Sequence, residues 1–473
     1  MTIEQIYTGC LAEAAYYIES NGEAAIIDPL REVKPYIERA KKDNANIKYI
    51  FETHFHADFV SGHVDLANET GAAIVYGPTS MKTGFQSLIA NDGEVFYLGD
   101  VKIKLIHTPG HTMESSCYLL IDESGKEKAL FTGDTLFIGD VGRPDLAQHV
   151  ISEMTQEKLA AHLFDSLRNK ILPLNDDIIV YPGHGAGSAC GKNMSKETYD
   201  TLGNQKKTNY ALNPKLTKKE FISQLLSGLT PPPGYFPQNV LMNISGYESF
   251  DDVMKKGIRF LEPNSFEAAY EEHKALIIDT RKAEDFCKGF VPNSINIGID
   301  GNFAVWLGAI VKNVKTPIVL IADSGKEEEV ITRMARVGFD NPIGFLKGGI
   351  EAWIKSNKTI DKIESVSAED FLDLYLKSKV NILDVRKRSE YESEHLIDSV
   401  NAPLDYVDES LALISKDKTW YVHCAGGYRS MIFVSILKSK GYSNLINVEG
   451  GFNQFKKLKG FNFSEYVCPT TML

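Results

Sequence analysis

The chain has 473 residues, and 51 Lys and Arg against 63 Asp and Glu give it a net charge of −12. This length predicts two to four domains rather than one core. Globular composition excludes a disordered or collagen-like chain, and the acidic balance argues against a nucleic-acid-binding protein. No apolar run reaches the ~20 residues of a membrane span, and the N-terminus shows no secretory signal. We therefore expect a cytoplasmic protein with no membrane or nucleic-acid partner.

The cysteines are spread along the whole chain, whereas the histidines are concentrated in its first part. Six cysteines are spread widely, which is typical of a reducing compartment and not of a disulfide framework. Eight of the 11 histidines precede residue 190. The first part of the chain is therefore expected to carry chemistry that the rest lacks.

Short apolar strands and Gly-rich loops alternate over residues 1–190, where we predict strands at Ala24–Ile27, Tyr49–Glu52, Ala72–Tyr76, Val101–Ile106, Cys117–Ile121, Lys128–Phe131 and Ile178–Tyr181. Predicted helices are Val33–Lys42, Glu157–Asn169, Lys196–Thr201 and Lys218–Ser227. The run Pro231–Gly234 ends the last of these and predicts a stiff crossing between domains.

After the proline run the chain repeats itself. Ala275–Arg281 resembles Val380–Arg386, and the matched aspartates of the two segments lie 105 residues apart. A period of this size indicates a duplicated domain and not a solenoid. Each copy alternates short buried strands with helices, which favours a parallel sheet. Both copies keep Asp-x-Arg, which favours a structural role for that pair.

Four apolar strands are each followed by residues able to bind a metal ion. One strand precedes Thr53-His54-Phe55-His56-Ala57-Asp58, and the other three precede Pro-Gly-His111-Thr, Thr-Gly-Asp134 and Pro-Gly-His184-Gly. Because residues at i, i+2 and i+4 of an extended segment project to one side, the side chains of the first motif can converge. Four such strand ends predict one shared metal site.

These motifs resemble the metallo-β-lactamase fold, a four-layer αββα sandwich with its site along one sheet edge. Dinuclear zinc hydrolases of that fold, such as glyoxalase II, carry His-x-His-x-Asp-His, and this chain has Phe59 at the last histidine. A phenyl ring cannot bind a metal ion. A second ion would keep only Asp58, Asp134 and His184 of the motif residues, which argues for one metal.

Within that fold the chain resembles the persulfide dioxygenases, whose mononuclear site of two imidazoles and one carboxylate suits Fe(II) and O₂. The resemblance places one Fe(II) per chain on His54, His111 and Asp134. His56, Asp58 and His184 would then orient the ligands and a bound water.

Two further residues fit that resemblance. Arg143, in Gly142-Arg143-Pro144-Asp145, could bind an anionic substrate group bidentately, although an ion pair with Asp145 is the alternative. Cys190 lies in a Gly-rich loop whose N–H groups, with Lys192, could lower the pKa of its thiol. Cys190 would be a catalytic thiol that receives sulfane sulfur, or else a packed cysteine.

The second repeat contains His423-Cys424-Ala425-Gly426-Gly427-Tyr428-Arg429, in which a buried strand ends at a cysteine and a short loop enters a helix. Loop N–H groups and the helix dipole favour an anion on Cys424. This resembles the active loop of the rhodanese fold, with Cys424 as nucleophile, Gly426 and Gly427 in the sulfur cradle and Arg429 binding an anionic substrate. In the first repeat we expect Asp323 at the nucleophile position, and hence an inactive domain.

The sequence therefore predicts an α/β multidomain protein: a metallo-β-lactamase sandwich at 1–245, an inactive rhodanese-like domain at 246–360 and an active rhodanese domain at 361–473. The resemblance implies oxidation of a low-molecular-weight persulfide, of glutathione or coenzyme A, by O₂ to sulfite and thiol. Cys424 would then form thiosulfate from sulfite. We also expect a homo-oligomer. The alternatives are a glyoxalase-II-like zinc thioester hydrolase and a non-enzymatic sulfur-relay scaffold.

Overall fold

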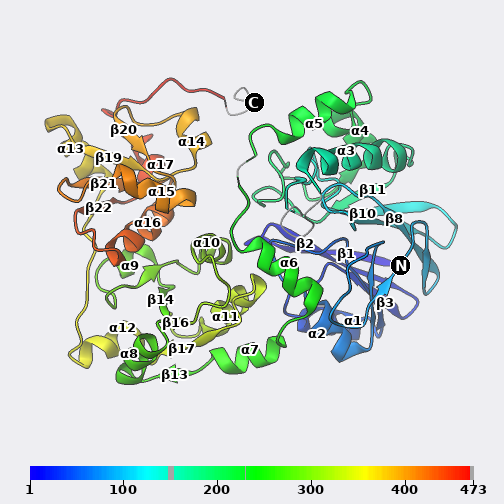
Figure 1. Cartoon of the computed structure of the whole chain (residues 1–473), viewed down its shortest axis with the longest axis horizontal. Coiled ribbons are helices and arrows are strands. Elements are labelled where there is room, and N and C mark those ends of the chain that lie inside the picture. The colour runs from blue at the N-terminus through cyan, green and yellow to red at the C-terminus, as the bar shows by residue number, and fades with distance from the viewer. Residues whose placement is uncertain (147–153, 230, 469–473) are drawn as a thin grey trace. The chain divides into compact units, whose positions relative to one another are not determined.

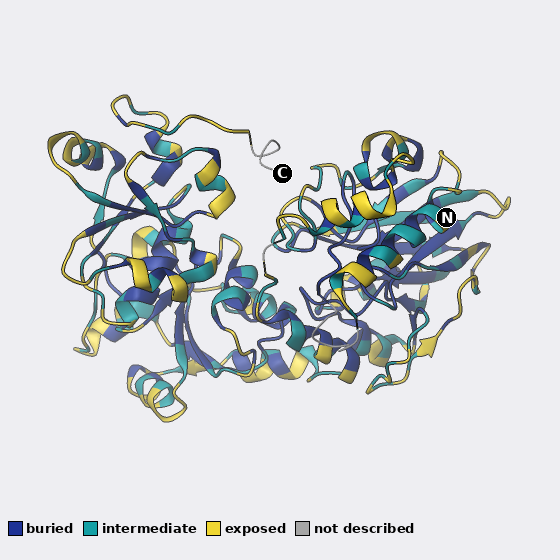
Figure 2. Ribbon diagram, turned by 45° about the horizontal axis from the view of Figure 1, so that its top comes forward, coloured by how far each residue is buried: buried dark blue, intermediate teal, exposed yellow. Residues whose placement is uncertain are grey.

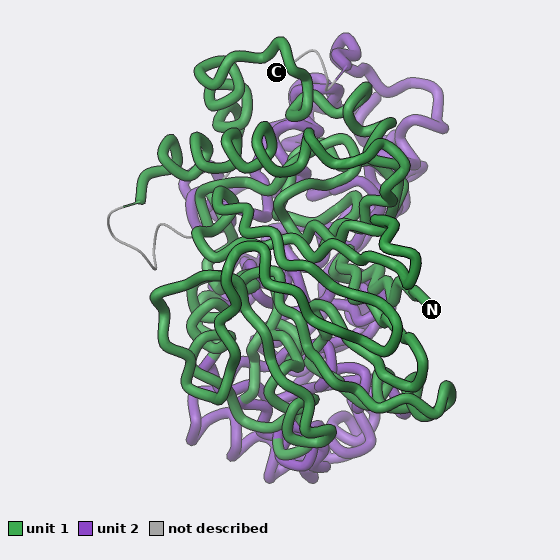
Figure 3. The backbone as a smooth tube through the Cα atoms, turned by 90° about the vertical axis from the view of Figure 1, so that its right-hand side faces the viewer, with its two compact units in different colours: residues 1–252, 312–314, 334–340 green, residues 253–311, 315–333, 341–473 purple. Residues whose placement is uncertain are grey.

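The computed structural model describes residues 1–146, 154–229 and 231–468 (Figure 1). They form two compact units (Figure 3). Unit 1 comprises residues 1–252, 312–314 and 334–340, and unit 2 comprises residues 253–311, 315–333 and 341–473. No helix among the described residues is long and apolar enough to cross a bilayer.

Unit 1 contains two six-stranded sheets. The first has the order β1-β2-β3-β4-β5-β6 and the second β12-β11-β10-β9-β8-β7. The first sheet consists of β1 (Thr2–Thr8), β2 (Glu13–Ser20), β3 (Glu23–Ile27), β4 (Asn46–Phe51), β5 (Ala73–Tyr76) and β6 (Leu88–Ile89). The second consists of β7 (Val95–Leu98), β8 (Val101–His107), β9 (Ser116–Ile121), β10 (Glu127–Gly133), β11 (Ile179–Pro182) and β12 (Asp200–Thr201).

Helices cover both outer faces of this sandwich. They are α1 (Lys34–Lys42), α2 (His63–Thr70), α3 (Gln156–Ser166), α4 (Leu202–Thr208), α5 (Lys218–Leu226) and α6 (Phe236–Ser245). A short π-helix, Leu167–Ile171, follows α3. α1 and α2 pack on the first sheet, and α3 and α5 share a core with the second. A second core, with Phe51 from the first sheet and Phe131 from the second, lies between the sheets. Figure 2 shows that much of the backbone of the strands in unit 1 is buried.

Unit 2 contains two five-stranded parallel sheets with equivalent strand orders, β13-β17-β16-β14-β15 and β18-β22-β21-β19-β20. The first consists of β13 (Phe260–Leu261), β14 (Leu276–Asp279), β15 (Ile295–Asn296), β16 (Ile318–Ile321) and β17 (Pro342–Leu346). The second consists of β18 (Ser365–Val366), β19 (Asn381–Asp384), β20 (Ser399–Asn401), β21 (Trp420–His423) and β22 (Leu445–Val448). The identical orders confirm the duplicated parallel fold.

The helices of the repeats also correspond. The first repeat has α8 (Pro263–Glu272), α9 (Ala283–Phe286), α10 (Phe303–Ile310), α11 (Glu327–Arg336) and α12 (Gly349–Lys355), and α7 (Phe250–Gly257) precedes it. The second has α13 (Ala368–Lys377), α14 (Arg388–Ser393), α15 (Val407–Ser410), α16 (Tyr428–Ser439) and α17 (Gly451–Phe455).

The structure corrects two of the local expectations. The predicted helix Lys196–Thr201 is wrong: those residues lead into β12, and α4 begins afterwards because the Thr201 side chain accepts a hydrogen bond from the backbone N–H of Asn204 and caps it. The proline run is not the crossing between the compact units. α6 follows it and still packs in unit 1, where Asn243 hydrogen-bonds the backbone of His56.

Candidate metal centre and sulfur-transfer loop

Four loops of unit 1 bring histidine and aspartate side chains together. β4 leads into the loop of His54, His56 and Asp58, and three strands of the second sheet lead to His111, Asp134 and His184. Each of these side chains is at most 6% exposed. The glycines of the motifs permit the close approach, because a Cβ on Gly183 would lie 2.9 Å from Asp134 Oδ1.

The first cluster consists of His54, His111 and Asp134, whose ligand atoms all lie within 4.8 Å of one another. Asp134 Oδ2 is 3.4 Å from His111 Nε2 and 4.0 Å from His54 Nε2. Among the residues that the structure describes, neither carboxylate oxygen of Asp134 has a hydrogen-bond partner, although both are buried. Since a buried, unpaired carboxylate is costly, this donor set fits a bound cation.

The outer nitrogens of both imidazoles are anchored. His111 Nδ1 lies 2.8 Å from the backbone oxygen of Arg143, and His54 Nδ1 lies 3.0 Å from Thr53 Oγ1. Donation from His111 Nδ1 leaves its Nε2 lone pair facing Asp134, as a metal-binding imidazole requires. Burial, together with the charges of His56, His111 and His184, holds the pKa of His54 well below its usual range. His54 is therefore neutral and able to bind a metal ion.

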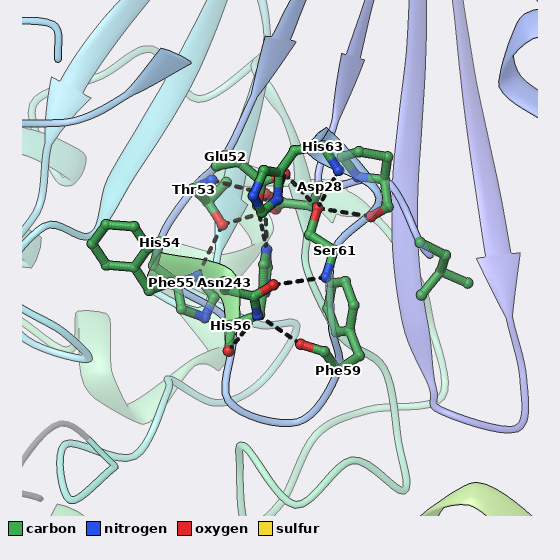
Figure 4. Close-up of polar contacts among 12 residues, drawn as sticks. Asp28, Glu52, Thr53, His54, Phe55, His56, Phe59, Ser61, His63 and Asn243 are labelled. Carbon is green, nitrogen blue, oxygen red and sulfur yellow. Dashed lines mark hydrogen bonds and ion pairs between the residues drawn. The ribbon is translucent and has the colours of Figure 1, made fainter. Parts of the chain in front are cut away.

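His56 is committed to a different set of partners (Figure 4). Its Nε2 lies 3.1 Å from Asp28 Oδ1 and 3.4 Å from Glu52 Oε2. Burial alone would lower the pKa of His56, but the two carboxylates outweigh burial and hold it well above its usual range. His56 therefore faces Asp28 and Glu52 and not the first cluster, and these three side chains form a separate group whose ligand atoms lie within 4.8 Å of one another. The Phe59 ring packs against it, with 4.3 Å between ring centroids.

Two buried polar residues near this loop do not belong to any of the motifs found in the sequence. Asn243, from α6, donates to the backbone oxygens of His56 and Phe59 and accepts from the N–H of Ser61 (Figure 4). No sequence pattern distinguishes Asn243, because α6 also carries Gln238, Asn239 and Ser245. Glu13, at the start of β2, is 1% exposed, and its carboxylate oxygens have no hydrogen-bond partner within the described part of the chain. A carboxylate beginning an apolar strand was the available signal.

The second cluster consists of Asp58, His184 and Cys190, again with all ligand atoms within 4.8 Å of one another. His184 Nε2 lies 3.3 Å from Asp58 Oδ2 and 3.5 Å from Asp134 Oδ1. Asp134 therefore presents one oxygen to each cluster.

The structure contradicts the expected activation of Cys190. The thiol is 1% exposed, and burial, reinforced by Asp58 and Asp134, raises its pKa well above the ordinary value. Lys192 does not compensate, because its ammonium donates to the backbone oxygens of Gln224 and Ser227.

Arg143 is 5% exposed and pairs with Asp145 through Nε and Nη2, with Nε 2.6 Å from Asp145 Oδ1. The alternative ion pair is thus present. Its backbone oxygen is also the group that anchors His111. Binding of an anionic substrate by Arg143 would require the Asp145 pair to share or release the guanidinium.

Cys424 follows β21 and lies before α16. The backbone N–H of Gly427 donates to Cys424 Sγ at 3.1 Å, and Gly427 itself has φ of +100°, which favours glycine. The backbone at Gly451 also lies close to Cys424, because a Cβ on Gly451 would lie 2.2 Å from the Cys424 backbone oxygen. A thiolate or persulfide anion here faces a helix N-terminus.

A cavity of about 520 Å³ lies beside this loop. The second repeat contributes Gly426, Gly427 and Tyr428 to its wall, and the first repeat contributes Lys282 and Gly298. The Tyr428 hydroxyl donates to the Gly298 oxygen at 2.7 Å. Both repeats therefore shape the space next to the sulfur cradle.

Arg429 points to a carboxylate of its own domain. Its Nη1 and Nη2 lie 2.6 and 2.9 Å from the two oxygens of Glu390. A role in binding an anionic donor or acceptor has to compete with this bidentate pair.

The first repeat differs from the expected alignment by one residue. Asp279 of β14 pairs with Ile321, whereas Asp384 of β19 pairs with His423. Ala322, and not Asp323, therefore stands at the position of Cys424. The sequence alone does not show the strand pairing that decides whether Ala322 or Asp323 corresponds to Cys424. The expected lack of a nucleophile is unaffected, since a methyl group cannot carry sulfur.

Comparison with known proteins agrees with this architecture. Residues 8–184 match the model of the metallo-beta-lactamase superfamily, and residues 262–356 and 367–458 match that of the rhodanese-like domain. The hydroxyacylglutathione hydrolase GloC of Haemophilus influenzae is 31% identical over 212 residues, which are 41% of this chain and 88% of that protein. The hydroxyacylglutathione hydrolase of Rhizobium etli is 35% identical over 34% of this chain and 57% of its own length.

A solved structure resembles a larger part of the chain. A metallo-beta-lactamase from Staphylococcus aureus subsp. aureus COL is 32% identical, with a TM-score of 0.64 over 73% of this chain and 98% of its own. With its sandwich, its His- and Asp-bearing strand ends and its two rhodanese-like domains, the chain belongs to the metallo-β-lactamase superfamily.

Proposed function

We propose that unit 1 is a non-haem Fe(II) persulfide dioxygenase and that the second rhodanese-like domain is a sulfurtransferase working with it. The observation that carries the proposal is the composition of the first cluster. It contains two imidazoles and one carboxylate, His54, His111 and Asp134, while His56 is bound to Asp28 and Glu52 instead. Two histidines and a carboxylate are the donor set of Fe(II) oxygenases and leave open positions.

Fe(II) held by these three side chains would supply the capacity to activate O₂. The protein contributes neutral, anchored imidazoles and a buried carboxylate. A persulfide RSSH, O₂ and water would give the thiol RSH and sulfite with two protons. Glutathione persulfide and coenzyme A persulfide are the substrates we propose.

Cys424 performs the second reaction in this proposal. Its thiolate attacks the outer sulfur of a persulfide and releases the thiol, which takes up the proton. Sulfite then attacks the outer sulfur of the cysteine persulfide, which forms thiosulfate and restores the thiolate. The N–H of Gly427 and the N-terminus of α16 stabilise both anionic forms of the cysteine.

The test is metal analysis of protein purified without oxygen, followed by oxygen uptake with glutathione persulfide. We expect one iron per chain in the triad and uptake that depends on the persulfide. His111→Ala should lose both the iron and the uptake, and His162→Ala, an exposed histidine on α3, should lose neither. Iron-loaded protein that consumes no oxygen with any persulfide would contradict the proposal.

A zinc thioester hydrolase is the second candidate. The specific observation in its favour is the 31% identity with GloC of Haemophilus influenzae, named as a hydroxyacylglutathione hydrolase. This candidate predicts cleavage of a glutathione thioester by zinc-loaded protein without oxygen. The same protein preparations distinguish the two candidates. Oxygen uptake is measured with the persulfide and, as a control, with the thioester, and thioester cleavage is measured with the thioester and, as a control, with the persulfide.

A further inference from the structure

The cavity of about 520 Å³ beside the Cys424 loop has walls from both repeats of unit 2. The second repeat contributes Gly426, Gly427 and Gly450. The N–H of Gly427 lies 3.1 Å from Cys424 Sγ, so the sulfur stands directly behind this wall. The volume is in the range of small-molecule sites and is larger than sulfite requires. It has room for the organic part of a persulfide donor.

Two glutamates, one from each repeat, line the cavity. Glu449 stands just before α17, where the N–H of Phe452 donates to the backbone oxygen of Cys424 at 2.8 Å. This hydrogen bond fixes the segment next to the sulfur loop. Glu284 belongs to α9 of the first repeat. Burial raises the pKa of the Cys287 thiol in the same wall, and Glu449 and Glu284 add to that effect, so the two carboxylates approach one place from opposite repeats.

The charge of the wall is predominantly negative. Among the lining residues that the structure describes, those with charged side chains are Lys282, Glu284, Asp300 and Glu449. Lys282 Nζ lies 3.9 Å from Asp300 Oδ2, so an acidic neighbour already partly balances this cation. Arg429 is not in the described lining, and its guanidinium pairs with a glutamate of its own domain. A wall with three carboxylates and one ammonium attracts a positively charged group and repels a polyanion.

We propose that this cavity binds the carrier thiol of the persulfide that loads Cys424, and that it selects a carrier with a free ammonium group. Glu284 and Glu449 receive the ammonium, and Lys282 receives a carboxylate of the same carrier. Cysteine persulfide and glutathione persulfide have both groups, whereas coenzyme A persulfide has phosphates and no ammonium. The first repeat thus determines donor specificity although it has no nucleophile. This role depends on the proposed sulfurtransferase function of the second repeat.

The test measures loading of Cys424 with sulfur by mass spectrometry, in the full chain without oxygen, so that no persulfide is oxidised. The donors are cysteine persulfide, N-acetylcysteine persulfide, which lacks the ammonium, and coenzyme A persulfide. We expect the second-order rate constant to be about three- to tenfold higher for cysteine persulfide than for its N-acetyl analogue, as one or two exposed ion pairs would give. Coenzyme A persulfide should be slower again.

Variants of the two glutamates separate donor selection from a structural effect. Glu284→Gln combined with Glu449→Gln should abolish the preference for the ammonium, and Glu449→Lys should accelerate loading by coenzyme A persulfide. Glu351→Gln is the matched control, because Glu351 is exposed on α12 and is not part of the cavity wall. It should keep the original ratio of rates. A general disturbance of the sulfur loop would slow all donors alike and leave that ratio unchanged.

Two kinds of failure are distinguishable. Equal rates for the three donors in the unaltered protein, or a preference that survives the double variant, would overturn the proposed selection and leave Cys424 as a sulfur acceptor. If no donor loads Cys424, inorganic polysulfide included, the sulfurtransferase function fails and the proposed selection fails with it.

Discussion

The two repeats of unit 2 share a scaffold and differ in one loop. In both, Arg Nη2 pairs with the aspartate two residues before it, at 2.6 Å for Arg281 and 2.5 Å for Arg386. In both, an asparagine donates to the backbone oxygens of that aspartate and arginine, Asn296 in the first and Asn401 in the second. Because both repeats make the same bonds, we infer that the Asp-x-Arg pair supports the fold whether or not a nucleophile is present.

The loops after the equivalent strands have opposite electrostatics. The second repeat places Cys424 before Gly427, whose N–H faces the sulfur, and Arg429 stands in the first turn of α16. The first repeat has Ala322 at the same register, and α11 begins with Glu327, Glu328 and Glu329. Acidic side chains suit a helix N-terminus but repel anionic sulfur compounds. The two repeats therefore share the Asp-x-Arg scaffold, whereas only the second has a loop suited to an anionic sulfur group.

The largest expected effect concerns the nucleophile. Cys424→Ser should reduce sulfur transfer from thiosulfate to the uncatalysed rate, because serine cannot form a persulfide. Ala322→Cys should not restore it, since the first repeat lacks the Gly-rich cradle. The rate of transfer to a thiol acceptor, measured for both variants and the double variant, checks this. Transfer by the double variant near the original rate would show that the two loops are equivalent after all.

The next effect concerns the shared scaffold. Arg386→Met and Arg281→Met each leave a buried aspartate without its partner, which should cost about 3–5 kcal/mol of the repeat's stability. Hydrogen exchange followed by mass spectrometry measures β14 and β19 separately. Equal losses are expected if the pair is structural in both repeats. Unchanged protection of either strand would contradict a structural role of the pair in that repeat.

The smallest effect is a pH dependence of opposite sign in the two repeats. Burial raises the pKa of Asp279, and Asp323 adds to this against the opposing effect of Arg281. Burial also acts on Asp384, but His423 and Arg386 outweigh it and lower its pKa. Asp384 therefore stabilises its repeat above the unfolded value of about 3.9, and this contribution is lost as pH falls through the lower folded pKa. The contribution of Asp279 to the stability of its repeat becomes more favourable as pH falls through its raised pKa.

Hydrogen exchange of β14 and β19 at a series of acid pH values tests that sign. Acidification should reduce the protection of β19 relative to β14. Asp279→Asn serves as the control, because it removes the Asp279 titration and leaves that of Asp384. A loss of protection that is identical in the two strands would contradict the electrostatic difference between the repeats.

Much of the fold could be predicted from local patterns. Each predicted strand of residues 1–190 overlaps an observed one, because buried apolar runs between Gly-rich loops are strong strand signals. The first strand, β1, was missed because its polar and apolar residues mix, as in Thr2–Thr8. The position of Ala322 required strand register, which a gapless comparison of the repeats does not contain.

The candidate site was predictable where its residues belong to a motif. His54, His111 and Asp134 each follow a strand in a short pattern, and the structure brings them together. Asn243 and Glu13 were missed because they reach the site from distant elements. The one-metal expectation counted only motif side chains, and Cys190, six residues after His184, adds a donor that motif spacing does not show. That expectation stays a prediction.

We propose that one chain oxidises a persulfide at the triad and joins the resulting sulfite to sulfane sulfur at Cys424. The most direct measurement follows oxygen uptake and thiosulfate together, with glutathione persulfide, in the unaltered protein and in Cys424→Ser. We predict thiosulfate from the unaltered protein, and from Cys424→Ser the same oxygen uptake with sulfite in place of thiosulfate. Unchanged thiosulfate from Cys424→Ser, or no persulfide-dependent oxygen uptake by either protein, would contradict the coupling of the two reactions.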